Sequence, residues 1–180
     1  CGRCWRSATP WPLEETPIVV GAELSDDQGI QTAEVYYRDS DTEGQNPGPW
    51  NSVAMSSIGG DAWEGTIPPR GSGVDKVDFY VSCTDVEGQT ITLPGSAPAT
   101  FREVAVGLTP IYEVQYVHPD SVNHDNNYLD LPVNVRGVVT AGTGDTTAPS
   151  QFILQEQEPG PYGGFRWGGI VVYEGTATYE

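Results

Sequence analysis

The chain has 180 residues, enough for one large hydrophobic core or for two small ones. It carries 25 acidic against 8 basic residues, which gives a formal net charge of -17. Such a polyanion lacks the clustered Lys and Arg that bind nucleic acid or anionic lipid, so nucleic acid is excluded as an expected partner. No apolar run reaches the roughly 20 residues that cross a bilayer, so no transmembrane segment is expected.

The composition points to β-structure. The chain has 22 Gly and 15 Pro, residues that interrupt regular structure, together with 9 Tyr and 5 Trp, which favour strands. Many short strands joined by tight turns account for both features. We therefore expect an all-β protein with few helices.

Residues 1–16 show neither helical nor strand periodicity and are expected to form an N-terminal tail. Cys1 and Cys4 have the spacing of a CxxC pair, which in an exported protein favours a disulfide that clips the tail or links it to a neighbouring chain. Cys1 is also the position at which a processed bacterial lipoprotein would be acylated. Trp5 and Trp11 are of a residue type enriched at interfaces, so the tail is a candidate inter-subunit strand or anchor.

From residue 17 to residue 104, strand candidates alternate with turn clusters. The expected strands are 18–24, 31–38, 50–55, 62–67, 76–84, 89–93 and 99–104. Seven short strands at this spacing predict an antiparallel sandwich. Alternation within 77–83 puts Cys83 on the same face as Val77, Phe79 and Val81, which predicts a buried core residue.

The segments 33–38, 50–55, 63–68, 77–81 and 84–88, in this order, resemble the immunoglobulin-like or fibronectin type III-like modules of large bacterial surface and secreted proteins. The resemblance covers about half of the chain. Such modules are usually spacers, stalks or adhesive units, so the resemblance implies a scaffold on the cell surface or in the secreted fraction.

The acidic segment 39–44 approximates the first half of a calcium loop, with Asp39, Asp41 and Glu43 as candidate ligands. Trp50 stands where the bidentate Glu of a complete EF-hand loop would fall. A solvated acidic loop is the simpler interpretation, and a calcium-dependent adhesin is the alternative that a real site would imply.

Residues 105–180 carry a second pattern, formed by the segments 111–116, 131–140, 151–155 and 168–173. Their order resembles the OB-like β-barrel domain of bacterial secreted nucleases and other exported multidomain proteins. In such a barrel, Gly137 would be the bend by which a long first strand serves both sides. The chain stops soon after Tyr173, so we expect the barrel to be incomplete or to be completed by a strand from elsewhere.

Tyr162, Phe165 and Trp167 lie in a Gly-rich stretch, 159–169, and are candidate interface residues. Aromatic side chains without surrounding positive charge suit a carbohydrate or a protein surface better than nucleic acid. A long inter-strand loop with packed rings is the simpler interpretation.

No nucleophile elbow, Cys–His arrangement, HExxH motif or phosphate-binding loop is present, so neither catalysis nor an organic cofactor is expected. The leading hypothesis is an extracellular or cell-surface structural protein that self-associates through its termini, as a filament subunit completed by strand exchange. The alternative is a ligand-binding segment of a larger secreted hydrolase, with a carbohydrate or a protein as its ligand.

Overall fold

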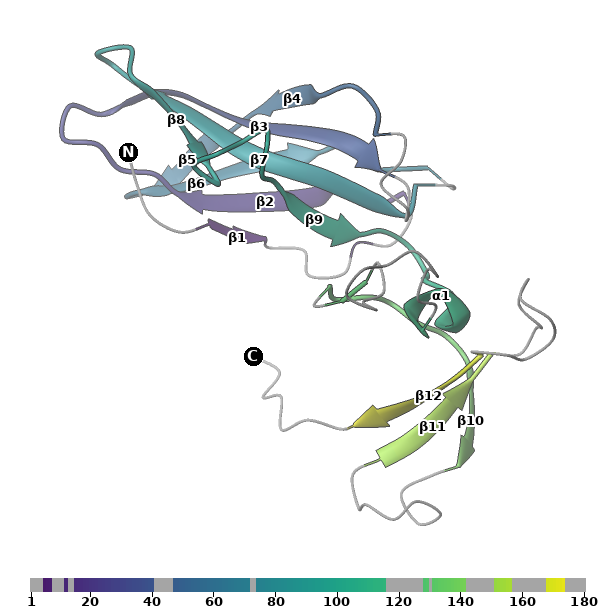
Figure 1. Ribbon diagram of the computed structural model, residues 1–180. Helices are drawn as coiled ribbons and strands as arrows, with labels where there is room; N and C mark the ends of the chain where they lie inside the picture. Colours follow the sequence, from purple (N-terminus) through teal and green to yellow (C-terminus); the bar gives the residue numbers. More distant parts are fainter. Residues whose placement is uncertain are drawn as a thin grey trace. The chain divides into compact units, whose positions relative to one another are not determined.

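The computed structural model describes residues 5–7, 12, 15–40, 47–71, 74–115, 128–129, 131–141, 151–156 and 168–173. The chain divides into two compact units, Cys1–Gly107 and Leu108–Glu180, called unit 1 and unit 2 below. Antiparallel sheets build both units, and the described residues contain a single short helix (Figure 1). The expected all-β class is confirmed.

Unit 1 is a sandwich of two antiparallel sheets. One sheet has the order β1-β2-β6-β5, and the other has the order β4-β3-β7-β8, with β9 also pairing β7. The strands are β1 (Trp5–Ser7), β2 (Ile18–Glu23), β3 (Ile30–Ser40), β4 (Asn51–Ala54), β5 (Ser56–Gly59), β6 (Ala62–Ile67), β7 (Lys76–Asp85), β8 (Thr90–Leu93) and β9 (Arg102–Ala105). Seven of them lie where alternation predicts strands. β1 and β5 are additional.

Part of the N-terminal segment belongs to the fold of its own unit. Strand β1 pairs with β2 in the register Trp5↔Ala22 to Ser7↔Val20, so it forms an edge of the first sheet. Farther along, the Pro12 carbonyl accepts a hydrogen bond from the Gly107 N–H at 2.9 Å. The sequence does not reveal β1, because three residues are too few to show an alternation, and a role of the tail between subunits stays a prediction.

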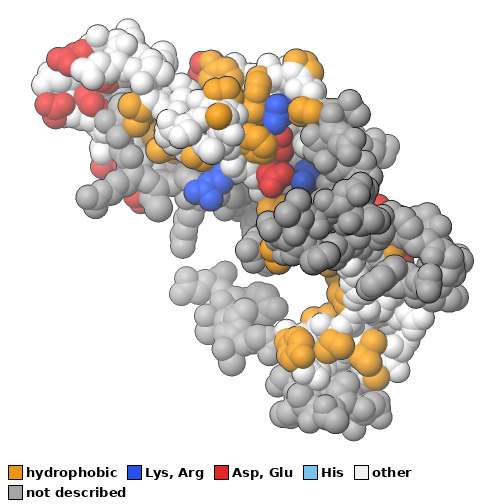
Figure 2. All heavy atoms as spheres, viewed as in Figure 1, with side chains coloured by type: hydrophobic (Ala, Val, Ile, Leu, Met, Phe, Trp, Pro, Cys, Tyr) orange, Lys and Arg blue, Asp and Glu red, His pale blue; other side chains and the backbone are white. Residues whose placement is uncertain are grey.

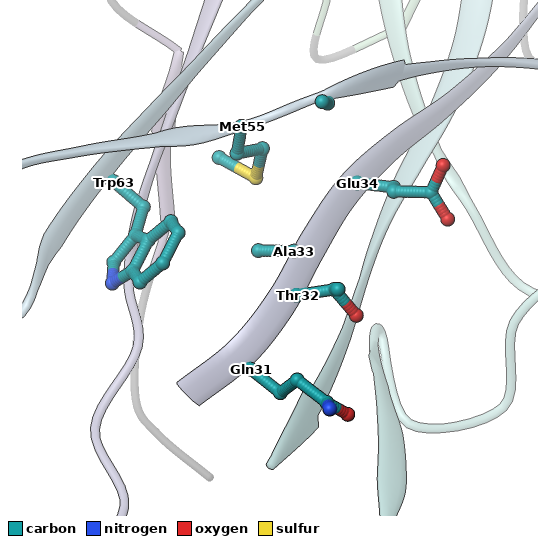
Figure 3. A pocket seen from close by; sticks show the side chains of 7 residues that line it. Gln31, Thr32, Ala33, Glu34, Met55 and Trp63 are labelled. Atoms are coloured by element: carbon teal, nitrogen blue, oxygen red, sulfur yellow. The ribbon is translucent and has the colours of Figure 1, made fainter. Parts of the chain in front are cut away.

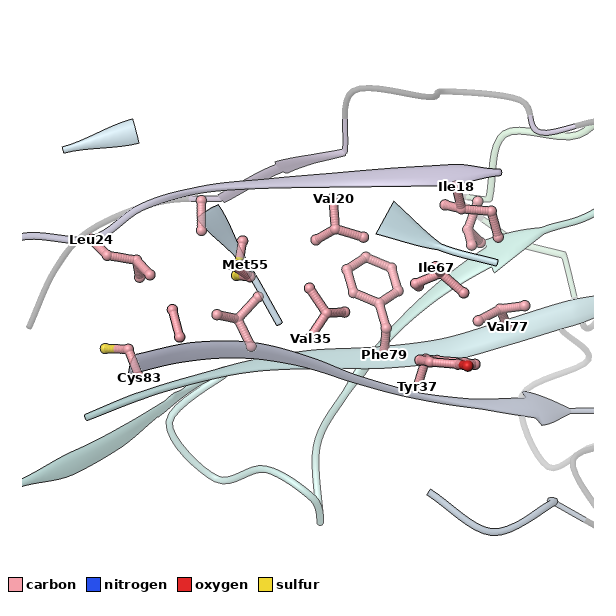
Figure 4. Close-up of a cluster of buried hydrophobic side chains, with 14 of the residues drawn as sticks. Ile18, Val20, Leu24, Val35, Tyr37, Met55, Ile67, Val77, Phe79 and Cys83 are labelled. Atoms are coloured by element: carbon pink, nitrogen blue, oxygen red, sulfur yellow. The ribbon is translucent and has the colours of Figure 1, made fainter. Parts of the chain in front are cut away.

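The core of unit 1 lies between the two sheets, as Figure 4 shows. The inward side chains are mostly β-branched or aromatic, and β2, β3 and β7 contribute every second residue. Fully buried members include Ile18, Val20, Val35, Ile67 and Val77. Cys83 is 2% exposed and unpaired, which confirms the prediction of a buried core cysteine.

Between β4 and β5 the chain passes from one sheet to the other through a single residue, Met55. Strand β4 ends at Ala54 in the second sheet, and β5 begins at Ser56 in the first. Met55 is buried, and its N–H donates to the Ala33 carbonyl at 2.8 Å. All four residues of β5 are exposed, which explains why no alternation in the sequence revealed this strand.

Strands β8 and β9 share one side of β7 but are not continuous. β8 pairs with Val81–Thr84 of β7, and β9 pairs with Lys76–Phe79. Residues 94–101 separate the two strands and form turns. This edge of the second sheet is therefore interrupted, which is one way in which β-proteins limit edge-to-edge association.

Unit 2 contains α1 (Ile111–Gln115) and the three-stranded sheet β10 (Val138–Ala141), β11 (Gln151–Gln155) and β12 (Gly169–Tyr173), in the order β10-β11-β12. Segment 111–116, part of the barrel-like pattern, begins as a helix. The Ile111 N–H donates to Glu156 Oε1 at 2.6 Å. Among the described parts of the chain, no helix is long and apolar enough to cross a membrane.

The expected long strand through Gly137 is shorter in the structure, because β10 begins only at Val138. Gly137 is needed for a different reason than a bend. A Cβ at this position would lie 2.5 Å from the Gln155 carbonyl oxygen, so only glycine allows this backbone to approach β11. The described residues form one sheet, and a barrel in unit 2 stays a prediction.

Replacing Gly65 with alanine should destabilise unit 1. A Cβ at Gly65 would lie 2.9 Å from Val35 Cγ2 and 3.0 Å from Met55 Cγ, so these buried side chains or the strands that carry them would have to shift. We expect a loss of about 1–3 kcal/mol in the free energy of unfolding, measured by urea denaturation. Gly71→Ala is the matched control. No described atom lies within 4 Å of its Cβ position, and we expect a change below about 0.5 kcal/mol. Equal effects would contradict the close approach.

Candidate functional site

The outward face of the second sheet of unit 1 carries aromatic and charged side chains. Pairing of β3 with β7 sets Tyr36 opposite Tyr80 and Arg38 opposite Asp78. Trp50 directly precedes β4, and Phe101 directly precedes β9. We call these six residues the outer-face cluster. Residues far apart in sequence meet here only because the strand register brings them together.

The rings of the outer-face cluster contact one another. Tyr36 and Tyr80 stack with a centroid distance of 4.9 Å and an interplanar angle of 4°, and Trp50 meets Tyr80 edge-on at 4.9 Å. The Arg38 guanidinium lies 4.5 Å from the Trp50 ring centroid and 4.9 Å from that of Phe101. The rings and the guanidinium thus pack against one another. This packing stabilises the face of the sheet rather than leaving the rings free to stack with a ligand.

Asp78 is the buried charge of this cluster. It is 1% exposed, and its Oδ2 accepts a hydrogen bond from Arg38 Nε at 2.8 Å. Its Oδ1 has no hydrogen-bond partner in the structure. Burial raises the pKa of Asp78 above the usual 3.8, against the opposing effect of Arg38. Nearby, buried Lys76 pairs with Glu103 at 2.9 Å.

Glu34 lies beside the cluster and is held by two hydroxyls. The Tyr36 hydroxyl donates to its Oε2 at 3.1 Å, and the Ser52 hydroxyl donates to its Oε1 at 3.2 Å. The bond to Glu34 raises the pKa of Tyr36, because the protonated hydroxyl is the donor. Both carboxylate oxygens of Glu34 are therefore engaged within the same face.

A pocket of about 380 Å³ opens where the chain crosses between the sheets. We call it the seam pocket, and it is lined by Gln31, Thr32, Ala33, Glu34, Ala54, Met55 and Trp63. Figure 3 shows the side chains of Ala33, Met55 and Trp63 converging on one side of β3, with those of Gln31, Thr32 and Glu34 on the other side. An aromatic ring and a thioether thus form its apolar wall.

The sheet of unit 2 has an unusual composition for such an acidic chain. Strands β10, β11 and β12 read VVTA, QFILQ and GIVVY and contain no charged residue. Val138, Val139, Val171 and Tyr173 are each at least 50% exposed. Figure 2 shows hydrophobic side chains gathered on the visible face over this sheet. Contiguous exposed apolar side chains of this kind typically mark interaction surfaces.

Of the candidate calcium ligands, only Asp39 lies in the described part of the chain. Its Oδ2 accepts a hydrogen bond from Arg70 Nη2 at 2.9 Å, so an ion pair engages one of the oxygens that a cation would need. Asp41 and Glu43 lie outside the described residues, and calcium binding stays a prediction. Within the described ranges, no group of three or more His, Cys, Asp or Glu residues could hold a metal ion.

The other candidate site residues are not brought together by the described structure. Six of them lie outside the described residues, namely Cys1, Cys4, Trp11, Tyr162, Phe165 and Trp167. The side chain of Trp5 also lies outside the described part of the chain. Sequence reasoning missed the outer-face cluster and the seam pocket. Alternation in the sequence indicates that β3 points Glu34, Tyr36 and Arg38 outward. The partners of these residues, however, depend on the strand register.

Comparison with known proteins gives no assignment. No protein-family model matches the chain, and no curated protein matches it.

The raised pKa of Asp78 predicts a pH effect. Between the unfolded and folded pKa values the folded protein binds more protons than the unfolded one, so stability falls as pH rises through this interval. Relative to Asp78→Asn, which does not titrate, the wild type should therefore gain stability as pH falls from neutral toward 3.8. Urea denaturation of both proteins across this range measures the difference. A wild type that loses stability relative to the variant on acidification would mean that Arg38 outweighs burial.

Cys83 should be unreactive in the folded protein. Burial raises the pKa of its thiol and blocks access to reagents, and the thiolate is the reactive form. In a Cys1→Ser, Cys4→Ser background, we expect its reaction with a disulfide reagent to be at least about a hundredfold slower in buffer than in urea. Rapid labelling of the native protein would contradict its place in the core.

Proposed function

We propose that the chain is a non-catalytic structural protein of the cell surface or secreted fraction that self-associates through its β-strands. Unit 1 serves as a rigid spacer, and unit 2 provides the exposed strands through which copies of the chain associate. The charge-free, partly exposed sheet of unit 2 is the observation that carries this proposal.

The proposal includes an immunoglobulin-like assignment for unit 1, which its strand order supports. Taken in chain order, β1 to β7 correspond to the strands A, B, C, C′, D, E and F of such a sandwich, and β8 with β9 to an interrupted strand G. The orders β1-β2-β6-β5 and β4-β3-β7-β8 then match A-B-E-D and C′-C-F-G. Modules of this type hold other parts of a protein at a distance.

The unit 2 sheet supports association for an electrostatic reason. Soluble proteins usually place charges on exposed edge strands, because a neutral edge invites pairing with another chain. This chain has 25 acidic residues, yet none lies in β10, β11 or β12. Among the described residues, no strand pairs with the outer edge of β10 or of β12. Such edges favour strand addition.

The edges of unit 1 differ from those of unit 2. One edge of the second sheet is interrupted between β8 and β9, and the opposite edge strand, β4, has only four residues before the crossing at Met55. In the first sheet, the edge strand β5 contains a register shift between Ser57 and Gly59. Interruptions, short strands and bulges all discourage pairing along a whole edge, so the exposed strand that drives association is assigned to unit 2.

Lysines on β12 should weaken self-association. The double variant Val171→Lys, Tyr173→Lys places two charges on an edge strand, and we expect the concentration at half-assembly to rise about tenfold or more, as measured by sedimentation velocity of the full chain. The substitutions also reduce the net charge of -17, so lower general repulsion works against the expected loss.

The matched control is Thr66→Lys, Ser96→Lys, which makes the same charge change at exposed positions of unit 1. It should leave assembly unchanged or strengthen it. Raising the salt from roughly 0.01 M to about 1 M should also strengthen assembly of the wild type, because the screening length falls from about 30 Å to about 3 Å. Monomers at every concentration and salt, or equal losses in both double variants, would refute the proposal.

A further inference from the structure

At the start of β3, one edge of the strand is not paired by any strand of the described residues. Pairing with β4 covers Glu34 to Tyr37, and the hydrogen bond from Met55 to Ala33 extends it by one residue. On that side, no strand of the described residues pairs with 30–32, although β7 pairs on the other side. A register shift between Ile30 and Thr32 marks a bulge at this position.

The seam pocket lies directly beside this edge. It is lined by residues 31–34 of β3, by Ala54 and Met55 at the crossing, and by Trp63 of the other sheet. Its one charged lining residue, Glu34, already accepts hydrogen bonds from Tyr36 and Ser52. The pocket therefore offers an apolar wall, with the Glu34 carboxylate on the other side of β3 (Figure 3), and its volume of about 380 Å³ accommodates a large apolar side chain.

An extended strand can bind the unpaired edge of β3 and the seam pocket at the same time. Its backbone can continue the β-ladder along 30–32, and an alternate side chain can enter the seam pocket against Trp63 and Met55. A charged strand would bury its charge against an apolar wall, at a considerable free-energy cost. The fitting occupant is a neutral strand rich in apolar side chains.

We propose that the seam pocket of unit 1 is a strand-docking site, and that its occupant is β12 of a second copy of the chain. Strand β12 reads GIVVY, is neutral, and exposes Val171 and Tyr173 by 50% and 70%. In a chain of net charge -17, a neutral strand with exposed apolar side chains can approach a second copy without added repulsion. This inference rests on the proposed self-association and names its two surfaces.

The contact is heterologous, because the pocket of unit 1 and the strand of unit 2 are different surfaces. Each copy then uses one surface on each neighbour, and repetition of the contact builds a closed ring or an open filament. An isologous contact, such as β12 pairing with β12, would stop at a dimer.

Cross-linking of mixed variants tests the contact. In full-length chains carrying Cys1→Ser and Cys4→Ser, one preparation receives Thr32→Cys at the exposed β3 edge and another receives Val171→Cys on β12. The two are mixed and treated with a short bismaleimide. Because each chain carries one accessible thiol, only links between copies are detected. The control mixture replaces Thr32→Cys with Thr66→Cys, at an exposed position of β6.

We expect the Thr32→Cys and Val171→Cys mixture to give a cross-linked heterodimer at least about tenfold more abundant than either homodimer or the control product. Predominant Val171→Cys homodimers would overturn the docking site while leaving self-association through β12 in place. Equal yields in the test and control mixtures would also overturn it. Absence of any product, together with monomers in sedimentation, would overturn the proposed function itself.

A pocket-filling variant gives a second readout. Ala54 is exposed and lines the seam pocket, so Ala54→Trp should fill it without disturbing the core. We expect the concentration at half-assembly to rise about tenfold, with Thr66→Trp as the matched control. Unchanged assembly of a folded Ala54→Trp protein would overturn the docking site.

Discussion

The antiparallel pairing of β3 with β7 determines most of what unit 1 presents. It runs from Ile30↔Asp85 to Ser40↔Lys76, and both strands lie inside their sheet. Because successive side chains point to opposite faces, one register fixes the core and the outer-face cluster together. A shift by one residue would turn Val35 outward and bring Arg38 into the core. Burial of the apolar inner face thus stabilises the strand pairing on which the outer face depends. The outer face would have little stability of its own.

The two faces of this pairing differ in their energetics. On the inner face, each fully buried aliphatic side chain contributes about 1.5–3 kcal/mol. On the outer face, Asp78 and Lys76 are buried charges, whose desolvation is offset only by their partners Arg38 and Glu103. The raised pKa of Asp78 shows that this compensation is incomplete. We therefore interpret the outer-face cluster as a device that fixes the strand register, at some cost in stability.

Alternation predicted the seven longer or half-buried strands of unit 1, because one buried face leaves a period of two in the sequence. It failed at β1, which is too short, and at β5, whose four residues are all exposed. The outer-face cluster could not be predicted, since Arg38 and Asp78 meet through pairing across 40 positions of sequence. In unit 2, Gly137 was predicted to be a bend in a strand. Its close approach to Gln155 could not be predicted, because it depends on how β10 lies on β11.

The crossing at Met55 has a mechanical consequence. The peptide chain leaves one sheet at Ala54 and enters the other at Ser56, so a single residue makes this connection between the layers, whereas the β2–β3 and β6–β7 connections are longer. Sliding of one sheet over the other by more than this residue's backbone allows would pull β4 or β5 out of its ladder. Unit 1 should therefore transmit tension between its two sheets as a stiff body.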